Sequence, residues 1–236
     1  MSLPLIAIAM GDAAGVGPEI IVKTLADPRW YARCRPFVIG DSDTLARAAS
    51  WLGDAAAGLR VRACADLHQA GRAPGTIDVW RPADLHMPPF EMGQISPALG
   101  RVAADCQREA MRLAQQGVIQ GLVTAPMNKE GFHRAGFDYP DELSYMTALT
   151  GAGRTTTMGV MRGLWVDTVA EHVPFREIAD LITQESVLWH IQQLAAVLAQ
   201  LPGAGARLAV AALNVHGGEG GAIGREEIDV LAPAIA

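Results

Sequence analysis

The stretch LIAIAMGDAAGVGPE, residues 5–19, decides the fold class of this chain. Residues 5–10 form a short apolar run with the length of a buried strand. A glycine-rich turn follows, and Pro18 begins a helical pattern that continues to Ala26, in agreement with the preference of proline for the first positions of a helix. A strand that turns through glycines into a helix is typical of α/β folds. The sequence therefore predicts a sheet with helices packed against it.

The same alternation of apolar runs and helical patterns continues along the chain. Strands are predicted at 36–40, near Val61, and at 76–80, 118–124 and 207–213, with a hairpin formed by 156–161 and 164–170. Helices are predicted at 42–51, from Ser96 as N-cap and Pro97 onward, at 175–201, and from about 224. Strands that alternate with helices are joined by right-handed crossovers. The predicted sheet is mostly parallel, and the hairpin makes it mixed.

Composition excludes several classes of protein. Half of the 236 residues are apolar and 19% are charged, which is enough to bury a core and excludes intrinsic disorder. The net charge of −6 is a poor electrostatic match for nucleic acid or an anionic membrane. The three cysteines are scattered, with no CxxC pair, and no apolar run is long enough to span a bilayer. Asp12 comes too early for a signal peptide. We therefore predict a cytoplasmic protein that acts on a small molecule.

Residues suited to chemistry follow four of the predicted strands. Asp12 lies in the turn after the first strand, and Lys129 follows the predicted strand at 118–124. His172 follows the second strand of the hairpin, and His216 follows the last predicted strand. Ligands of open α/β sheets bind beyond the carboxyl ends of the strands. This convergence predicts a small-molecule site at that edge, where the two histidines could share a divalent cation.

Each of these residues also has a purely structural interpretation. The turn at residues 11–17 matches neither a GxGxxG nor a Walker A loop, so it can be a tight turn rather than a phosphate cradle. Lys129 alone can be a solvated surface charge, and a histidine is often a hydrogen-bonded structural residue. Only two histidines have a suitable context, whereas a catalytic metal normally has three protein ligands. The glycines around Glu219 fit either a flexible loop or one that wraps closely around a metal-bound substrate.

Four segments occur in an order that is specific to one family. They are GDAAGVGPE (11–19), TAPMNKE (124–130), EHVPFR (171–176) and LNVHGGEGG (213–221). In these segments the chain resembles the 4-hydroxythreonine-4-phosphate dehydrogenase family of pyridoxine and pyridoxal phosphate biosynthesis. The resemblance spans the whole chain, which corresponds to roughly the N-terminal two-thirds of a member.

The resemblance implies a fold, cofactors and an assembly. The implied fold is a three-layer α/β/α fold like that of isocitrate and isopropylmalate dehydrogenases, in a homodimer with active sites at the subunit interface. The implied cofactors are NAD or NADP and a divalent metal (zinc, magnesium, manganese or cobalt), with His172 and His216 as two metal ligands. The family's third metal histidine lies in a downstream block that residues 1–236 do not contain. We therefore interpret residues 1–236 as an incomplete member with two interleaved α/β lobes, lacking its C-terminal part, and expect uncovered sheet and helix surfaces.

One segment departs from the family pattern. Where the family carries a His-Thr pair that contacts the substrate, this chain has Glu142 and Leu143, and we interpret both as substrate-binding positions. An acidic side chain would repel a substrate phosphate. The substrate is therefore open between 4-hydroxythreonine 4-phosphate, another phosphorylated four-carbon acid, and a cis-dihydrodiol dicarboxylate such as that from terephthalate.

The predicted activity is the oxidation of a β-hydroxy acid, which then loses carbon dioxide. Lys129 and Asp12 are the candidate catalytic residues, with Lys129 assigned to substrate binding or proton transfer. A metal held by the two histidines would stabilise the alkoxide and the enolate, and the nicotinamide would accept the hydride.

Two other classes of function remain open. One is a metal-dependent hydrolase or aldolase that uses the same histidines with a carboxylate, and the other is a non-catalytic small-molecule-binding module.

Overall fold

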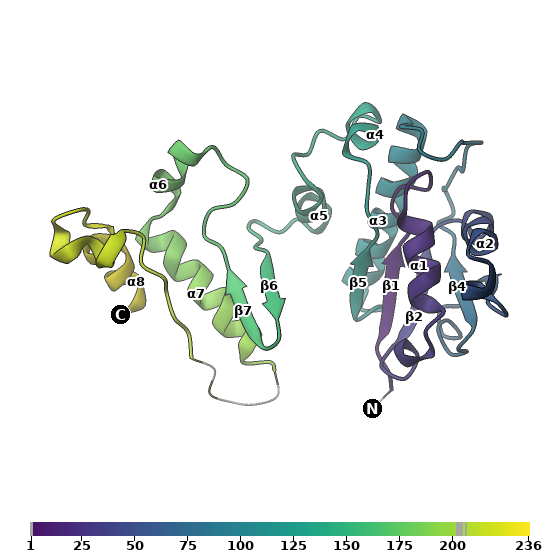
Figure 1. Cartoon of the computed structure of the whole chain (residues 1–236), viewed down its shortest axis with the longest axis horizontal. Helices are drawn as coiled ribbons and strands as arrows, with labels where there is room; N and C mark the ends of the chain where they lie inside the picture. The colour runs from purple at the N-terminus through teal and green to yellow at the C-terminus, as the bar shows by residue number, and fades with distance from the viewer. Residues whose placement is uncertain (1, 202–204, 206) are drawn as a thin grey trace. The chain divides into compact units, whose positions relative to one another are not determined.

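The chain forms two compact units, Met1–Gly153 and Arg154–Ala236 (Figure 1). The computed structural model describes residues 2–201, 205 and 207–236. The last helix of the first unit ends at Gly151, whose φ of +67° is a left-handed conformation that suits glycine. The second unit begins three residues later, at Arg154.

The first unit is built on five strands in the order β3-β4-β2-β1-β5, and all neighbouring pairs are parallel. In β1, which lies between β2 and β5, Ile8 is opposite Val38 of β2 and Val123 of β5. Almost every residue of this strand is buried, as is typical of a parallel strand covered on both faces. The strands are β1 (Leu5–Ala9), β2 (Arg35–Ile39), β3 (Arg60–Ala63), β4 (Thr76–Trp80) and β5 (Gly121–Thr124).

Helices cover both faces of this sheet, so the first unit has three layers. Figure 1 shows α1 in front of the sheet and α3 behind it, where α3 contacts β1, β2 and β5. The α/β/α fold predicted from the sequence is confirmed. The helices are α1 (Gly17–Leu25), α2 (Ser42–Trp51), α3 (Pro97–Gln115), α4 (Lys129–Arg134) and α5 (Glu142–Thr150), with 3₁₀ turns η1 (Pro28–Trp30) and η2 (Gly53–Ala56).

Helix α3 joins two hydrophobic clusters. One of its faces packs Leu99, Val102 and Cys106 into the main core under the sheet. Another face carries Ala104 into a smaller cluster with Phe132 of α4 and Tyr145 of α5, whose rings lie 5.3 Å apart in an edge-to-face arrangement. Burial of one such side chain contributes about 1.5–3 kcal/mol. The smaller cluster therefore holds α4 and α5 firmly against α3.

The second unit is smaller, and its described residues form a single two-stranded sheet. Its two strands pair antiparallel as the predicted hairpin, with Val160 opposite Trp165. Its small core contains Val187, Leu231 and Ala234. Its elements are β6 (Met158–Met161), β7 (Leu164–Asp167), η3 (Phe175–Glu177), α6 (Ile178–Leu181), α7 (Gln184–Leu198), η4 (Val215–Gly221), the π-helical turn η5 (Glu227–Leu231) and α8 (Ala232–Ile235).

Three predictions about the second unit are wrong in detail. The hairpin forms its own two-stranded sheet, so the five-stranded sheet is purely parallel rather than mixed. The predicted helix at 175–201 is interrupted before Thr183, whose side chain accepts a hydrogen bond from the Ser186 backbone N–H and so starts α7 anew. The segment 207–213 is not a strand. The backbone N–H of Leu213 instead donates to the Glu227 carboxylate at 2.8 Å.

One prediction about the first unit also needs correction. Ser96 precedes α3 as expected, but its side chain makes no capping hydrogen bond. Its backbone carbonyl accepts the Gly100 N–H at 2.9 Å instead.

None of the described helices has the length and hydropathy needed to cross a membrane.

Candidate functional site

The turn after β1 meets the loop after β5. The Asp12 backbone N–H donates to the Pro126 carbonyl at 3.0 Å. Gly11 has a φ of +71°, and a Cβ there would lie 2.5 Å from the same carbonyl oxygen, so only glycine allows this contact. The two strand ends that the sequence singled out therefore meet at the carboxyl edge of the sheet.

Asp12 is partly buried within this turn. Its carboxylate accepts the Ala14 backbone N–H at 3.0 Å. Burial raises the pKa of Asp12, and the hydrogen bond from Ala14 offsets part of that rise. A carboxyl group that is less acidic than usual can hold or release a proton closer to neutral pH.

Lys129 begins α4 directly after the loop from β5. The helix start is fixed by Asn128, whose side-chain oxygen accepts the Gly131 N–H at 2.8 Å. The Lys129 side chain is exposed, and its positive charge acts on the Glu142 carboxylate. The structure thus brings together two of the residues predicted from the sequence, one proposed as catalytic and one as substrate-binding.

Glu142 is the first residue of α5 and is half-buried. Burial raises its pKa, while hydrogen bonds from Thr124 and Gln107 and the charge of Lys129 act in the opposite direction. Thr124 is the last residue of β5. The carboxylate therefore lies at the carboxyl edge of the sheet, where the sequence predicted a small-molecule site.

Leu143 follows Glu142 in the first turn of α5. Its backbone carbonyl accepts the Thr147 hydroxyl at 2.7 Å, and the residue is of intermediate exposure. Its role as a substrate-binding position stays a prediction.

Sequence reasoning missed Gln107, which donates through Nε2 to the Glu142 carboxylate. The apolar stripe of α3 drew attention to one face of the helix. A second stripe of small residues, Gly100 and Ala104, leads to Gln107 at helical spacing and faces α4 and α5. Gln107 is buried on this face. The sequence signal that could have identified Gln107 is its place as a polar residue at the end of this stripe of small residues.

The two candidate metal histidines lie in the second unit, and both are exposed. His172 has a φ of +55° and His216 one of +52°, which are left-handed conformations that non-glycine residues rarely adopt. The His216 Nδ1 lies 2.9 Å from the Glu219 carboxylate. Such strained residues cost about 1–3 kcal/mol each and cluster at functional sites.

The donor set in the structure does not fit a complete metal site. Among the described residues, no group of three His, Cys, Asp or Glu side chains is arranged to hold a metal ion. His172 and His216 alone fall short of the three protein ligands that a catalytic metal normally has.

A further polar cluster in the second unit was not predicted. His190 Nδ1 lies 2.9 Å from the Asp167 carboxylate, which also accepts the Thr156 hydroxyl at 2.5 Å. Both His190 and Asp167 are almost fully buried. The pair joins α7 to β7 and fits a structural role, because hydrogen bonds satisfy both partners inside the unit.

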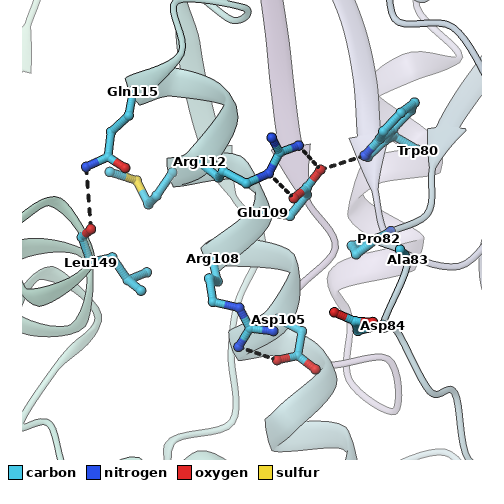
Figure 2. Close-up of a pocket in the computed structure, with 11 residues that line it drawn as sticks. Trp80, Pro82, Ala83, Asp84, Asp105, Arg108, Glu109, Arg112, Gln115 and Leu149 are labelled. Carbon is cyan, nitrogen blue, oxygen red and sulfur yellow. Dashed lines mark hydrogen bonds and ion pairs between the residues drawn. The ribbon is translucent and has the colours of Figure 1, made fainter.

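The first unit also contains a cavity of about 460 Å³ beside α3 (Figure 2). Two ion pairs line its walls, one between Arg108 and Asp105 and one between Arg112 and Glu109. Trp80, at the end of β4, donates its indole N–H to Glu109 at 2.8 Å. None of the residues predicted to act in catalysis or binding lines this cavity, so it does not define the candidate site.

Comparison with known proteins gives the chain a family. The family model of the pyridoxal phosphate biosynthetic protein PdxA matches residues 32–236. A 4-hydroxythreonine-4-phosphate dehydrogenase of Geobacter metallireducens is 37% identical over 233 residues, which are 99% of this chain and 68% of the relative. The chain belongs to the PdxA family. Its named relatives are dehydrogenases, which are oxidoreductases that act on CH–OH groups.

Solved structures agree with this membership. A crystal structure of a 4-hydroxythreonine-4-phosphate dehydrogenase from Burkholderia phymatum has a TM-score of 0.88 and 36% identity, covering 100% of this chain and 70% of that chain. A terephthalate 1,2-cis-dihydrodiol dehydrogenase from Burkholderia xenovorans is 22% identical with a TM-score of 0.62, and it covers 98% of this chain and 68% of that chain. This second likeness shows a shared fold only.

Proposed function

We propose that this PdxA-family chain is an NAD- or NADP-dependent dehydrogenase that oxidises a β-hydroxy acid, which then loses carbon dioxide. Family membership supports the oxidation of a CH–OH group. Two observations at the ends of β1 and β5 support the proposal further: the Asp12 turn is bonded to the loop after β5, and the charge of Lys129 acts on Glu142. Parallel α/β sheets bind their ligands at this edge.

The side chains at this edge have distinct proposed tasks. Lys129 binds the substrate carboxylate, since an exposed ammonium is free to approach an anion. Oxidation transfers a hydride from the hydroxyl-bearing carbon to a bound nicotinamide, which supplies the redox chemistry. The hydroxyl proton leaves at the same time, and we assign its acceptance to the partly buried Asp12, whose pKa is raised by burial. After carbon dioxide leaves, the enolate takes a proton, which Lys129 can donate.

The proposal also includes a divalent metal, a homodimer and a cytoplasmic location. The proposed metal ligands are His172 and His216. A third ligand is also required, and the described residues contain no group of three His, Cys, Asp or Glu side chains that could hold a metal. The strained backbone at both histidines supports a functional role for them. No chemical step above depends on the metal. Three further features stay predictions: the homodimer, the cytoplasmic location and the two interleaved lobes. Light scattering on the complete gene product tests the homodimer.

Substrate-dependent absorbance at 340 nm tests the proposed activity. We expect NAD or NADP reduction with a β-hydroxy acid, and a loss of about 10²–10⁴-fold in kcat/KM for Lys129→Ala, the range typical of a lost general acid. Arg134→Ala is the matched control, because Arg134 is an exposed cation of the same helix that pairs with Glu130. Turnover without nicotinamide reduction would instead support a hydrolase or aldolase, and binding without turnover would support a non-catalytic module.

Metal content tests the two histidines separately from the redox activity. We expect His172→Ala and His216→Ala each to lower the bound metal measured by mass spectrometry. His133→Ala is the control, since its Nε2 lies 2.8 Å from the Tyr139 carbonyl in the first unit. Full metal occupancy in both variants would contradict the assignment of these ligands.

A further inference from the structure

Two neighbouring strands of the five-stranded sheet lead to helices on opposite faces. β2 leads into α2, which packs beside α1, whereas β4 leads through the segment 81–96 into α3 behind the sheet (Figure 1). Such a divergence opens a crevice beyond the carboxyl ends of the strands, where open α/β sheets bind ligands. A cavity of about 440 Å³ is lined there by Asp41, shortly after β2, and Arg81, directly after β4. Its place in the fold is therefore that of a ligand site.

The ion pair at the edge of this cavity is already satisfied. Asp41 pairs with Arg81 through one carboxylate oxygen, and its other oxygen accepts the backbone N–H and the hydroxyl of Thr44, both at 2.9 Å. Arg81 also donates to the Leu85 carbonyl at 3.1 Å. The charges of Asp41 and Arg81 compensate each other, and the pair fixes the first turn of α2.

Arg47, one turn further along α2, also lines the cavity but lacks such partners. Its Nε and Nη2 atoms are buried and have no hydrogen-bond partner among the described residues. Buried donors without acceptors are costly, because they have lost their hydration and gained nothing in return. Nε and Nη2 form one edge of the guanidinium group, which binds a carboxylate through two parallel N–H···O bonds. The structure therefore leaves a two-pronged donor without its acceptors.

Aromatic rings hold this guanidinium group in place. Its Cζ lies 4.1 Å from the centroid of the Phe90 ring and 5.7 Å from that of Trp51. A guanidinium group stacks favourably on an aromatic face, which fixes its plane. The segment 87–90, which contains Phe90, supplies Met, two Pro and Phe as an apolar wall of the cavity. The cavity thus combines an oriented cation with apolar surface.

We propose that this cavity binds a small organic acid. The carboxylate bridges the Nε–H and Nη2–H of Arg47, and the apolar part of the acid lies against the segment 87–90. That segment is partly exposed and forms neither helix nor strand, so it can shift to admit the acid to the buried nitrogens. Asp43, an exposed acidic residue, also lines the cavity and adds negative charge. A monoanionic carboxylate is therefore favoured over a phosphate, which carries about two charges.

The candidate catalytic residues do not explain this cavity. Neither Asp12 nor Lys129 lines it, and Glu142 does not line it either. The bound acid therefore needs no part in the proposed oxidation, and the inference does not rest on the proposed function.

Benzoate and benzamide test the requirement for a carboxylate, because they share a ring and differ in charge. Both are titrated by calorimetry into the complete gene product. We expect benzoate to bind at least about tenfold more tightly than benzamide, which is the order expected for one charge-assisted hydrogen bond. Phenyl phosphate carries the same ring with about two negative charges, and it should bind more weakly than benzoate.

Two arginine variants locate the binding. Arg47→Lys keeps a positive charge and removes the planar pair of donors, so it should weaken benzoate by about tenfold or more. Arg101→Lys is the matched control in the same unit. The Cζ of Arg101 also lies over a ring, 5.1 Å from Phe137, but its Nη2 already donates to the Ala135 carbonyl at 2.9 Å. Arg101 does not line the cavity, so its replacement should leave benzoate affinity unchanged.

Each outcome decides the proposal. It is overturned if benzoate does not bind, binds no more tightly than benzamide or more weakly than phenyl phosphate, or binds Arg47→Lys with full affinity. If Arg47→Lys does not fold by circular dichroism, Asp43→Asn decides instead. That exposed substitution removes the competing negative charge, so the preference for benzoate over phenyl phosphate should shrink, and an unchanged preference would then refute the site.

Discussion

The two units bury their apolar residues to very different extents. In the first unit, Phe37 and Val38 of β2 are fully buried between two layers of helices. In the second unit, Phe175 is 91% exposed and Val160 of β6 is 56% exposed. A groove of about 500 Å³, lined mostly by apolar residues, also runs between β7 and the segment 208–213.

This difference shows how much a sheet depends on its neighbours. Five parallel strands covered on both faces form a continuous core. A two-stranded hairpin is marginal by itself and gains stability only from what packs against it. We therefore expect the second unit to open locally at a lower free energy than the first, which hydrogen exchange can measure for each unit separately.

The largest expected effect comes from one substitution made in each unit. Phe37→Ala removes a fully buried ring and should lower the free energy of unfolding of the first unit by about 3–5 kcal/mol. Phe175→Ala removes an exposed ring and should change the stability of the second unit by less than about 0.5 kcal/mol. Hydrogen exchange read over β2 and over α7 reports the two units. A comparable loss from Phe175→Ala would mean that its ring packs against something in solution.

An intermediate effect is expected from a substitution that keeps side-chain shape. Val38→Thr places a hydroxyl in the interior of the parallel sheet, where an unpaired hydroxyl costs about 1–3 kcal/mol. Val160→Thr places the same group on the exposed hairpin and should cost less than about 0.5 kcal/mol. Urea unfolding of both variants measures the difference. Equal costs would show that the two sheets are buried alike.

Local patterns in the sequence predicted the first unit well. The strand, turn and helix of residues 5–25 and the helix at 42–51 lie where they were predicted. Local signals suffice there, because apolar runs and caps act over a few residues. The segment 207–213 has the same apolar character, but a strand also needs a paired neighbour that its own residues do not specify.

The candidate site shows the same limit. Asp12, Lys129 and Glu142 could be chosen from the sequence because each follows a strand or a family motif. The contact between Gln107 and Glu142 joins residues 35 positions apart, through the packing of α3 against α5. A pairing of that kind depends on how helices meet, which hydrophobic periodicity does not encode.

The smallest expected effect is a difference in pH dependence between the units. In the second unit, ionised Glu227 accepts backbone N–H groups of Leu213 at 2.8 Å and Asn214 at 2.6 Å. The side-chain amide and the backbone N–H of Asn214 are the largest causes that lower its pKa from 4.5 to about 2. This stabilisation is present above pH 4.5 and is lost as the pH falls towards 2.

Asp12 in the first unit behaves in the opposite way. Burial raises its pKa above the ordinary value of 3.8, so its ionisation opposes folding. Its contribution to stability is therefore greatest below pH 3.8 and declines as the pH rises through its folded-state pKa. Mild acid should thus loosen the second unit through Glu227, while protonation of Asp12 favours the first unit.

Hydrogen exchange between pH 5 and 2.5 tests this contrast at roughly the pH range where these carboxyl groups titrate. Protection of the amides of Leu213 and Asn214 should fall as Glu227 is protonated, and Glu227→Gln should remove that pH dependence. Asp229→Asn is the control, since Asp229 pairs with the exposed Arg225 side chain instead of the 213–214 backbone. Protection that still falls with pH in Glu227→Gln would show that another group links the segment 207–213 to η5, and the acid sensitivity of the second unit would then lie outside this contact.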